Sequence, residues 1–141
     1  MSTLFARQSA VIEFTVLGEP RPQGSAKAFI PKGWKRAIIT SDNSKLKPWR
    51  QEIAGTAVAF GGMKFHREQA LEITLNFYFS RPKSVKRNQP TVKPDVDKLV
   101  RAVFDALTGI LFDDDAQIVE HHARKHYGGP PRVEIRIQEA V

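Results

Sequence analysis

Alternation of apolar and polar residues predicts the strands of this chain. It is longest between Gln69 and Ser80, where one side carries Leu71, Ile73, Leu75, Phe77 and Phe79. A period of two residues is typical of a strand that buries one face and leaves the other less buried. Shorter runs predict strands at Val11 to Leu17, Gln117 to Tyr127 and Val133 to Gln138.

Two other stretches have apolar residues at intervals of three and four, the spacing of an amphipathic helix. The first starts within Ser41 to Ser44, reaches about Phe60 and has an apolar face of Leu46, Trp49, Ile53, Ala57 and Phe60. The second starts near Asp95, ends at Thr108 and Gly109 and has an apolar face of Leu99, Val100, Val103, Phe104 and Leu107. Pro94 keeps the residue before it extended, and aspartate is a preferred helix N-cap, so the second helix has a well-marked start.

These elements predict a single α+β domain over residues 11–141, preceded by a flexible segment at residues 1–10. We expect a mixed, mostly antiparallel sheet of four or five strands packed with two main helices. A short strand or irregular hairpin is expected within Ala28 to Thr40. The last two strands are expected to form an antiparallel pair, because Gly128 to Pro131 between them is a turn sequence.

The composition indicates an anionic partner, because the formal net charge is +7. Nucleic acid is the leading candidate. The chain has no cysteine, which excludes disulfides, thiol catalysis and Cys-based zinc sites, and His121, His122 and His126 fit no common zinc motif. No apolar stretch is long enough to span a bilayer, and Met1 to Ala10 lacks the apolar core of a secretion signal. We therefore expect a cytoplasmic protein with no membrane partner.

Acidic residues gather in one part of this basic chain. The segment from Lys93 to Glu120 contains the six aspartates Asp95, Asp97, Asp105, Asp113, Asp114 and Asp115. A hard divalent cation between such carboxylates and a polyanionic substrate is the simplest account of this arrangement. We expect Asp95 and Asp97, from the helix start, to meet Asp115, from the mouth of the next strand. The alternative is ordinary: aspartate is common at helix caps and in solvated loops.

The same segment resembles the RusA family of Holliday-junction resolvases. The matching residues are Lys93 to Asp97, Leu99, Phe104 to Leu107 and Asp114 to Val119. The resemblance implies a small, homodimeric endonuclease that uses Mg²⁺, with Mn²⁺ as a substitute, to resolve four-way DNA junctions. It also implies that Asp95, Asp97 and Asp115 are catalytic metal ligands, with Asp114 completing or supporting the set.

Two residues depart from the family pattern. Arg101 stands where the family usually has a catalytic lysine, and Lys98 stands where it often has asparagine. Arginine holds a phosphate with two hydrogen bonds but does not give up a proton. Arg101 therefore serves as the catalytic cation only if charge alone is needed, and Asp105, one turn further along the helix, is expected to orient it. The alternatives are a catalytically weak or inactive junction-binding protein and a general metal-dependent phosphoesterase.

Several basic residues are candidate DNA contacts. They are Arg21 and Lys27 in a turn-rich loop, Lys93 and Lys98 beside the acidic residues, and Lys125 in the strand that follows. Trp34 is flanked by Lys32, Lys35 and Arg36, a combination suited to base stacking and phosphate pairing. The pattern by itself favours the plainer interpretation that Trp34 is a partly buried anchor of its hairpin.

Overall fold

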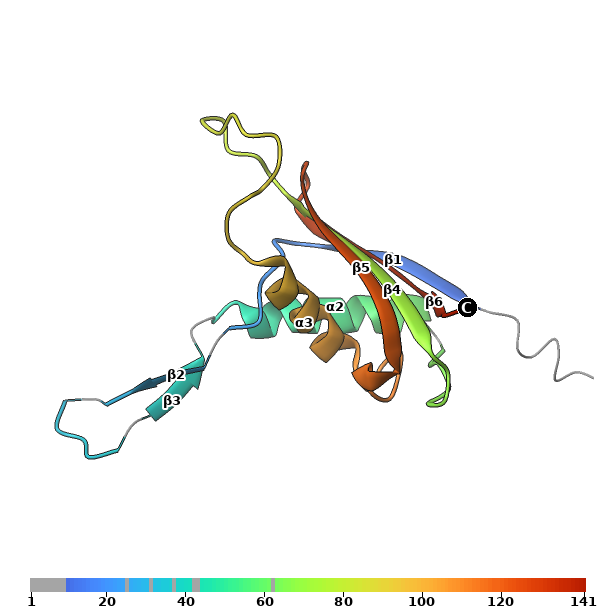
Figure 1. Ribbon diagram of the computed structural model, residues 1–141, viewed down its shortest axis with the longest axis horizontal. Coiled ribbons are helices and arrows are strands. Elements are labelled where there is room, and N and C mark those ends of the chain that lie inside the picture. The colour runs from blue at the N-terminus through green and yellow to red at the C-terminus, as the bar shows by residue number, and fades with distance from the viewer. Residues whose placement is uncertain (1–9, 25, 31, 37, 42–43, 62) are drawn as a thin grey trace, which may run out of the picture.

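The computed structural model describes residues 10–141 except 25, 31, 37, 42, 43 and 62, with backbone alone described at 26–29, 38–41 and 61. Residues 1–9 of the flexible segment predicted at 1–10 therefore lie outside the described residues. The elements are β1 (Val11–Leu17), β2 (Ala26–Phe29), β3 (Ile38–Ser41), α2 (Leu46–Gly61), β4 (Leu71–Phe79), α3 (Val96–Leu107), the 3₁₀ turn η1 (Asp115–Gln117), β5 (Ile118–Tyr127) and β6 (Arg132–Glu139). Both helices lie on one side of the main sheet (Figure 1).

The main sheet has the strand order β1-β6-β4-β5. β6 runs antiparallel to β1 and β4, whereas β5 runs parallel to β4. This confirms the expected α+β domain with a mixed, mostly antiparallel sheet.

The expected pairing of β5 with β6 is wrong, because β4 lies between them. β4 has the most completely buried inner face of the strands. In its central position, the backbone N–H and C=O groups on both of its edges are hydrogen-bonded to neighbouring strands. The loop to β6 then passes the end of β4, where the Gly128 N–H donates to the Phe79 carbonyl.

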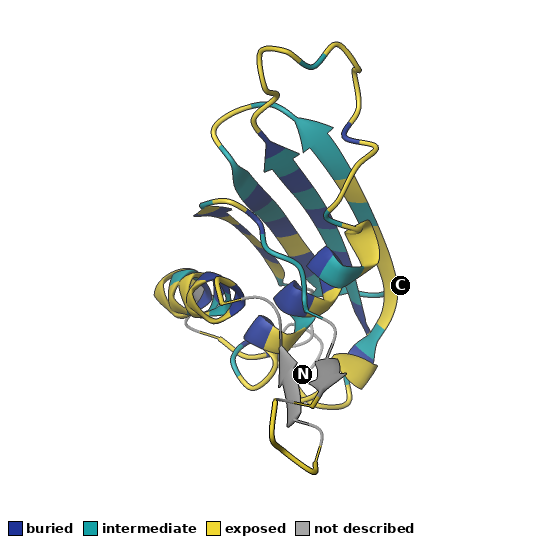
Figure 2. Cartoon of the chain, turned by 90° about the vertical axis from the view of Figure 1, so that its left-hand side faces the viewer, coloured by how far each residue is buried: buried dark blue, intermediate teal, exposed yellow. Residues whose placement is uncertain are grey.

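The core fills the space between the sheet and the two helices. Alternate side chains of β4 are buried, as the alternation predicted, and they meet the buried faces of α2 and α3 (Figure 2). α2 buries Leu46, Trp49, Ile53 and Ala57. Phe60 was expected on the same face but is 65% exposed, because it lies in the last turn of α2 and stacks on Phe14 at the rim of the core.

β2 and β3 form a separate antiparallel hairpin, confirming the element expected within Ala28 to Thr40. The hairpin extends away from the main body (Figure 1). Its tip is not a packing anchor, since Trp34 is 59% exposed. Over the described part of the chain, no helix has the length and apolar content needed to cross a membrane.

Candidate metal site and nucleic-acid interface

The start of α3 presents two exposed carboxylates. Asp95 is the N-cap and Asp97 lies in the first turn, as predicted, and the Asp95 side chain makes no capping hydrogen bond. Carboxylates are favoured at this end of a helix by the unpaired N–H groups and the helix dipole. Because both side chains are exposed and Asp95 makes no capping bond, both carboxylates remain available as oxygen ligands for a hard cation.

The loop after β1 lies against this helix start. The backbone N–H of Gln23 donates to the carbonyl of Lys98 at 2.9 Å. Arg21, a predicted DNA contact, is two residues away in the same loop and half-buried. The contact places a basic loop from the N-terminal part of the chain beside the carboxylates of α3.

Lys125, a predicted DNA contact on β5, is bonded to the backbone that leads into α3. Its ammonium donates to the carbonyls of Val92 and Pro94 at 2.7 and 2.8 Å. These carbonyls belong to the last residues before Asp95. Lys125 thus fastens the loop leading into α3 to β5, and this contact uses two of its three hydrogens.

We expect Lys125→Met to loosen that attachment. Two hydrogen bonds from a charged donor would be lost, lowering the free energy of unfolding by about 1–3 kcal/mol. The Mg²⁺ concentration needed to occupy a site at Asp95 and Asp97 should rise, because both carboxylates would be less firmly placed. Urea unfolding and a Mg²⁺ titration measure both effects. Lys83→Met, in the exposed part of the same loop, removes an equal charge and should leave both quantities unchanged.

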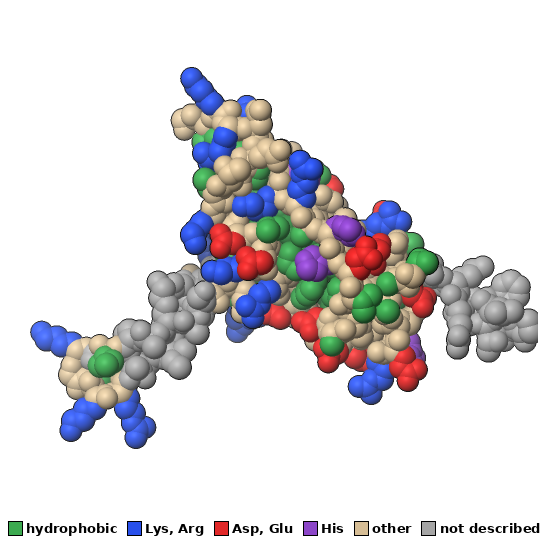
Figure 3. All heavy atoms as spheres, viewed as in Figure 1, with side chains coloured by type: hydrophobic (Ala, Val, Ile, Leu, Met, Phe, Trp, Pro, Cys, Tyr) green, Lys and Arg blue, Asp and Glu red, His purple; other side chains and the backbone are tan. Residues whose placement is uncertain are grey.

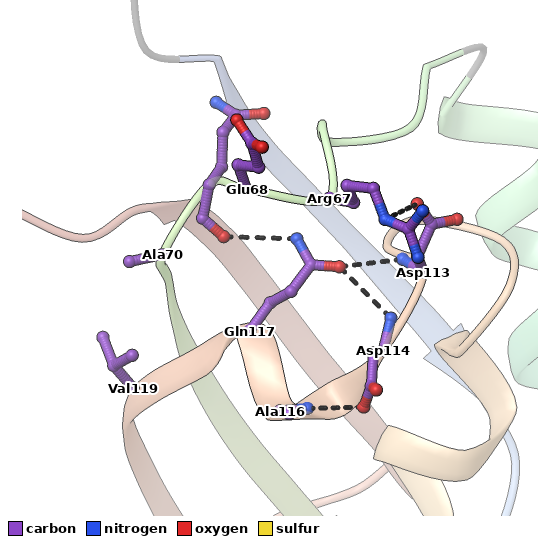
Figure 4. Close-up of a pocket in the computed structure, with 9 residues that line it drawn as sticks. Arg67, Glu68, Ala70, Asp113, Asp114, Ala116, Gln117 and Val119 are labelled. Atoms are coloured by element: carbon purple, nitrogen blue, oxygen red, sulfur yellow. Dashed lines mark hydrogen bonds and ion pairs between the residues drawn. The ribbon is translucent and has the colours of Figure 1, made fainter.

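The second acidic group, Asp113 to Asp115, lies in the loop after α3 and is held in place by hydrogen bonds to Gln117. The Gln117 side chain accepts from the N–H groups of Asp113 and Asp114 at 2.9 and 3.2 Å. It also donates to the carbonyls of His66 and Gln69 at 2.9 and 3.2 Å. Figure 4 shows Gln117 with its contacts to Asp113 and Asp114. Gln117 is only 9% exposed. It therefore joins the acidic loop to the loop before β4.

Sequence reasoning missed this residue, although a signal for it was present. Asp114 accepts from the N–H of Ala116, and the Gln117 side chain returns to the Asp114 N–H, forming a capping box. Asp-x-x-Gln before an apolar pair is a recognisable form of that motif. Figure 4 shows the Gln117 amide pointing inward between the two loops. The hollow beside it has a volume of about 400 Å³.

Asp113 is held by cations and not by the α3 carboxylates. It pairs with Lys64, and its other oxygen lies 4.0 Å from Arg67 Nε. The hydrogen bond from Lys64 holds the pKa of Asp113 below its ordinary value, and the charge of Arg67 acts in the same direction. Asp114 and Asp115 are exposed beside it.

The structure does not bring Asp95, Asp97 and Asp115 together within one chain. Across the described residues, none of these carboxylates belongs to a group of three possible metal ligands within 4.8 Å of one another. The physical reason is the length of α3. Lys125 on β5 contacts the backbone at the start of α3, whereas Asp115 lies just before the first residue of β5. The stretch of β5 between them is roughly 20 Å long, which keeps Asp115 away from the start of α3. The expected meeting is therefore wrong for a single chain, because β5 begins beside the C-terminal end of α3 and Asp95 and Asp97 lie at its N-terminal end.

The expected pairing of Arg101 with Asp105 is also wrong. Asp105 faces α2, where its carboxylate lies 3.8 Å from Arg50 Nη1. Arg101 is exposed, and Asp97 lies one turn before it on the same side of α3. The Arg101 guanidinium thus remains open to solvent on the face that carries Asp97.

Figure 3 shows acidic side chains surrounded by lysines and arginines around the start of α3. Among the predicted DNA contacts, Lys93 is exposed and Lys98 is half-buried at this place. Lys27 lies in β2, and its side chain is outside the described residues. The surface beside the carboxylates is therefore basic, which favours the approach of a phosphate backbone.

A separate group of possible metal ligands lies on the sheet face away from the helices. It consists of Glu72, Glu120 and His122, the only such group among the described residues. His122 Nε2 lies 2.8 Å from Glu120, and this hydrogen bond holds the Glu120 pKa below its ordinary value. Gln138 donates to Glu72 at 3.0 Å. These contacts already account for the three side chains, and the group lies on a different face from Asp97.

Fold and site together define a small α+β protein with a helix-borne carboxylate pair set in a basic surface. Residues 17–138 match the sequence profile of endodeoxyribonuclease RusA. The chain therefore belongs to the RusA endodeoxyribonuclease family. It is also 33% identical to "Uncharacterized protein YqaN" of Bacillus subtilis (strain 168) over 145 positions, covering 91% of this chain and 96% of that protein.

Proposed function

We propose that this protein is a Mg²⁺-dependent endonuclease that resolves four-way DNA junctions by paired symmetric nicks. Membership of the family gives the class of chemistry. The observation that carries the proposal is the exposed pair Asp95 and Asp97 at the start of α3, surrounded by basic residues. A divalent cation held there would polarise the scissile phosphate and lower the pKa of a bound water.

The chain's own residues bind and orient the substrate. Asp95 and Asp97 supply carboxylate oxygens, the donors that Mg²⁺ prefers. Arg101, one turn further along the same side of α3, holds a phosphate oxygen and stabilises the charge that grows during hydrolysis. Lys93, Lys98 and Arg21 guide the DNA backbone toward the carboxylates.

Asp115 fits this proposal if two chains build each site. A junction needs two matched cuts, which a symmetric homodimer provides and a single site does not. Asp95 and Asp97 lie at one end of α3 and Asp115 at the other, about a helix length away. We infer that a partner with its α3 running in the opposite direction places its Asp115, supported by its Asp114, beside Asp97. Each dimer would then have two complete sites.

The test is cleavage of a labelled synthetic four-way junction, with and without Mg²⁺, beside a linear duplex of matched sequence. We expect paired nicks at symmetric positions in the junction, dependent on Mg²⁺ or Mn²⁺, and little cutting of the duplex. Equal cutting of both substrates would indicate a general phosphoesterase.

Junction binding without nicks would indicate an inactive binding protein. Arg101 would be the first residue to examine in that case, because arginine does not transfer a proton. Restored cleavage by Arg101→Lys would then show that the reaction requires a proton from this position.

A further inference from the structure

The tip of the β2–β3 hairpin presents an exposed aromatic ring among cations. Trp34 is 59% exposed, and Lys32, Lys35 and Arg36 around it are all exposed. None of these four side chains makes a hydrogen bond, ion pair or ring contact with another described residue. Figure 3 shows their positive charges spread around the end of the projecting hairpin. A large apolar ring that is mostly exposed to solvent is a candidate contact surface.

The charge around the ring selects the kind of partner. From residue 20 to residue 41 the chain carries five cations, Arg21, Lys27, Lys32, Lys35 and Arg36, and no acidic residue. Such a segment suits a polyanion, and a phosphate backbone is the polyanion that also offers aromatic rings for stacking.

The β2–β3 hairpin that carries the Trp34 ring starts close to the carboxylates at the start of α3. Gln23, three residues before β2, is bonded to the carbonyl of Lys98 in α3. The base of the hairpin is therefore fixed beside the helix that carries Asp97, and the tip projects from it (Figure 1). The stretch of chain from Ala26 to Trp34 is long enough to reach roughly 20 Å from that base.

We propose that Trp34 stacks on an unpaired or unstacked base of branched DNA while Lys32, Lys35 and Arg36 contact the flanking phosphates. In a continuous duplex both faces of each base are covered by its neighbours, so the indole has nothing to stack on. At a branch point a base face is open. The hairpin tip would thus contribute to discrimination between junction and duplex, an inference that rests on the proposed function.

The experiment uses the intrinsic fluorescence of the protein, which has two tryptophans. Trp34 is exposed and Trp49 is 5% exposed, so a DNA base can reach only the first. The wild-type protein in EDTA is titrated with a four-way junction, a duplex of matched sequence and a single strand. We expect strong quenching by the junction and the single strand and little quenching by the duplex.

Variants measure the contribution to affinity. Trp34→Ala should weaken junction binding by about tenfold to a hundredfold, the usual effect of losing one stacked base, and should leave duplex binding nearly unchanged. Trp34→Phe should retain most of the affinity. Lys35→Ala should weaken binding to both substrates and reduce the salt dependence by about one counterion. Phe60→Ala, at an aromatic residue equally exposed on α2, is the matched control and should bind like the wild type.

Three results would overturn the stacking role. They are unchanged junction affinity in Trp34→Ala, equal loss for junction and duplex, and a change of oligomeric state by size-exclusion chromatography, which would make the tip a contact between chains. If the wild type nicks junctions while Trp34→Ala matches it, only this inference fails. If the wild type binds no DNA, the proposed function itself fails.

Discussion

Dimers that combine an Asp97→Asn chain with an Asp115→Asn chain should cut junctions, although neither variant should cut them alone. If each site takes Asp97 from one chain and Asp115 from the other, both substitutions in a mixed dimer fall in the same site. The other site then carries neither substitution. Half of the dimers in an equal mixture are mixed, so the rate of first nicks should reach about a quarter of the wild-type value. Paired resolution should remain absent, because each mixed dimer has one complete site. Co-expression with two affinity tags isolates the mixed dimer for assay.

A mixture of Asp95→Asn with Asp97→Asn is the matched control. Both residues lie at the same end of α3, so each site in that mixed dimer lacks one carboxylate and no activity should return. Failure of the first mixture as well, with both variants folded and dimeric, would mean that Asp115 does not complete the partner's site. Activity in Asp115→Asn alone would remove this residue from the proposed metal ligands.

Gln117→Leu is expected to destabilise the protein and abolish most cleavage. The leucine fills the space of the amide but leaves the N–H groups of Asp113 and Asp114 and the carbonyls of His66 and Gln69 without their partner. Losing these four part-buried hydrogen bonds should cost about 2–4 kcal/mol of unfolding free energy. Nicking should fall at least tenfold under conditions where the variant is folded, because Asp114 and Asp115 would no longer be fixed.

Urea unfolding and single-turnover junction cleavage measure these two effects separately. Gln51→Leu, at an exposed position of α2, makes the same chemical change without those contacts and should resemble the wild type. Wild-type stability in Gln117→Leu would show that the link between the two loops contributes nothing. Normal cleavage by a destabilised variant would show that the loop keeps its place without the amide.

Local patterns predicted the elements well because their causes are local. The alternation in β4, the capping aspartate before α3 and the glycine after it act over a few residues, and the structure has each where it was expected. The exposed line of Asp97, Arg101 and Asp105 followed from the helical period alone. The contacts of those residues did not, because Arg50, which pairs with Asp105, is brought to it only when α2 packs against α3.

The sequence by itself determined the helices, the strands and the chemical types available at the acidic segment, since spacing and composition are properties of neighbouring residues. Only the tertiary structure decided that β4 separates β5 from β6, that Lys125 holds the backbone before Asp95, and that α3 keeps Asp115 away from Asp97. These outcomes depend on which distant segments share a surface. That choice is made by burying the apolar faces of the whole domain at once, which no short window of the chain records.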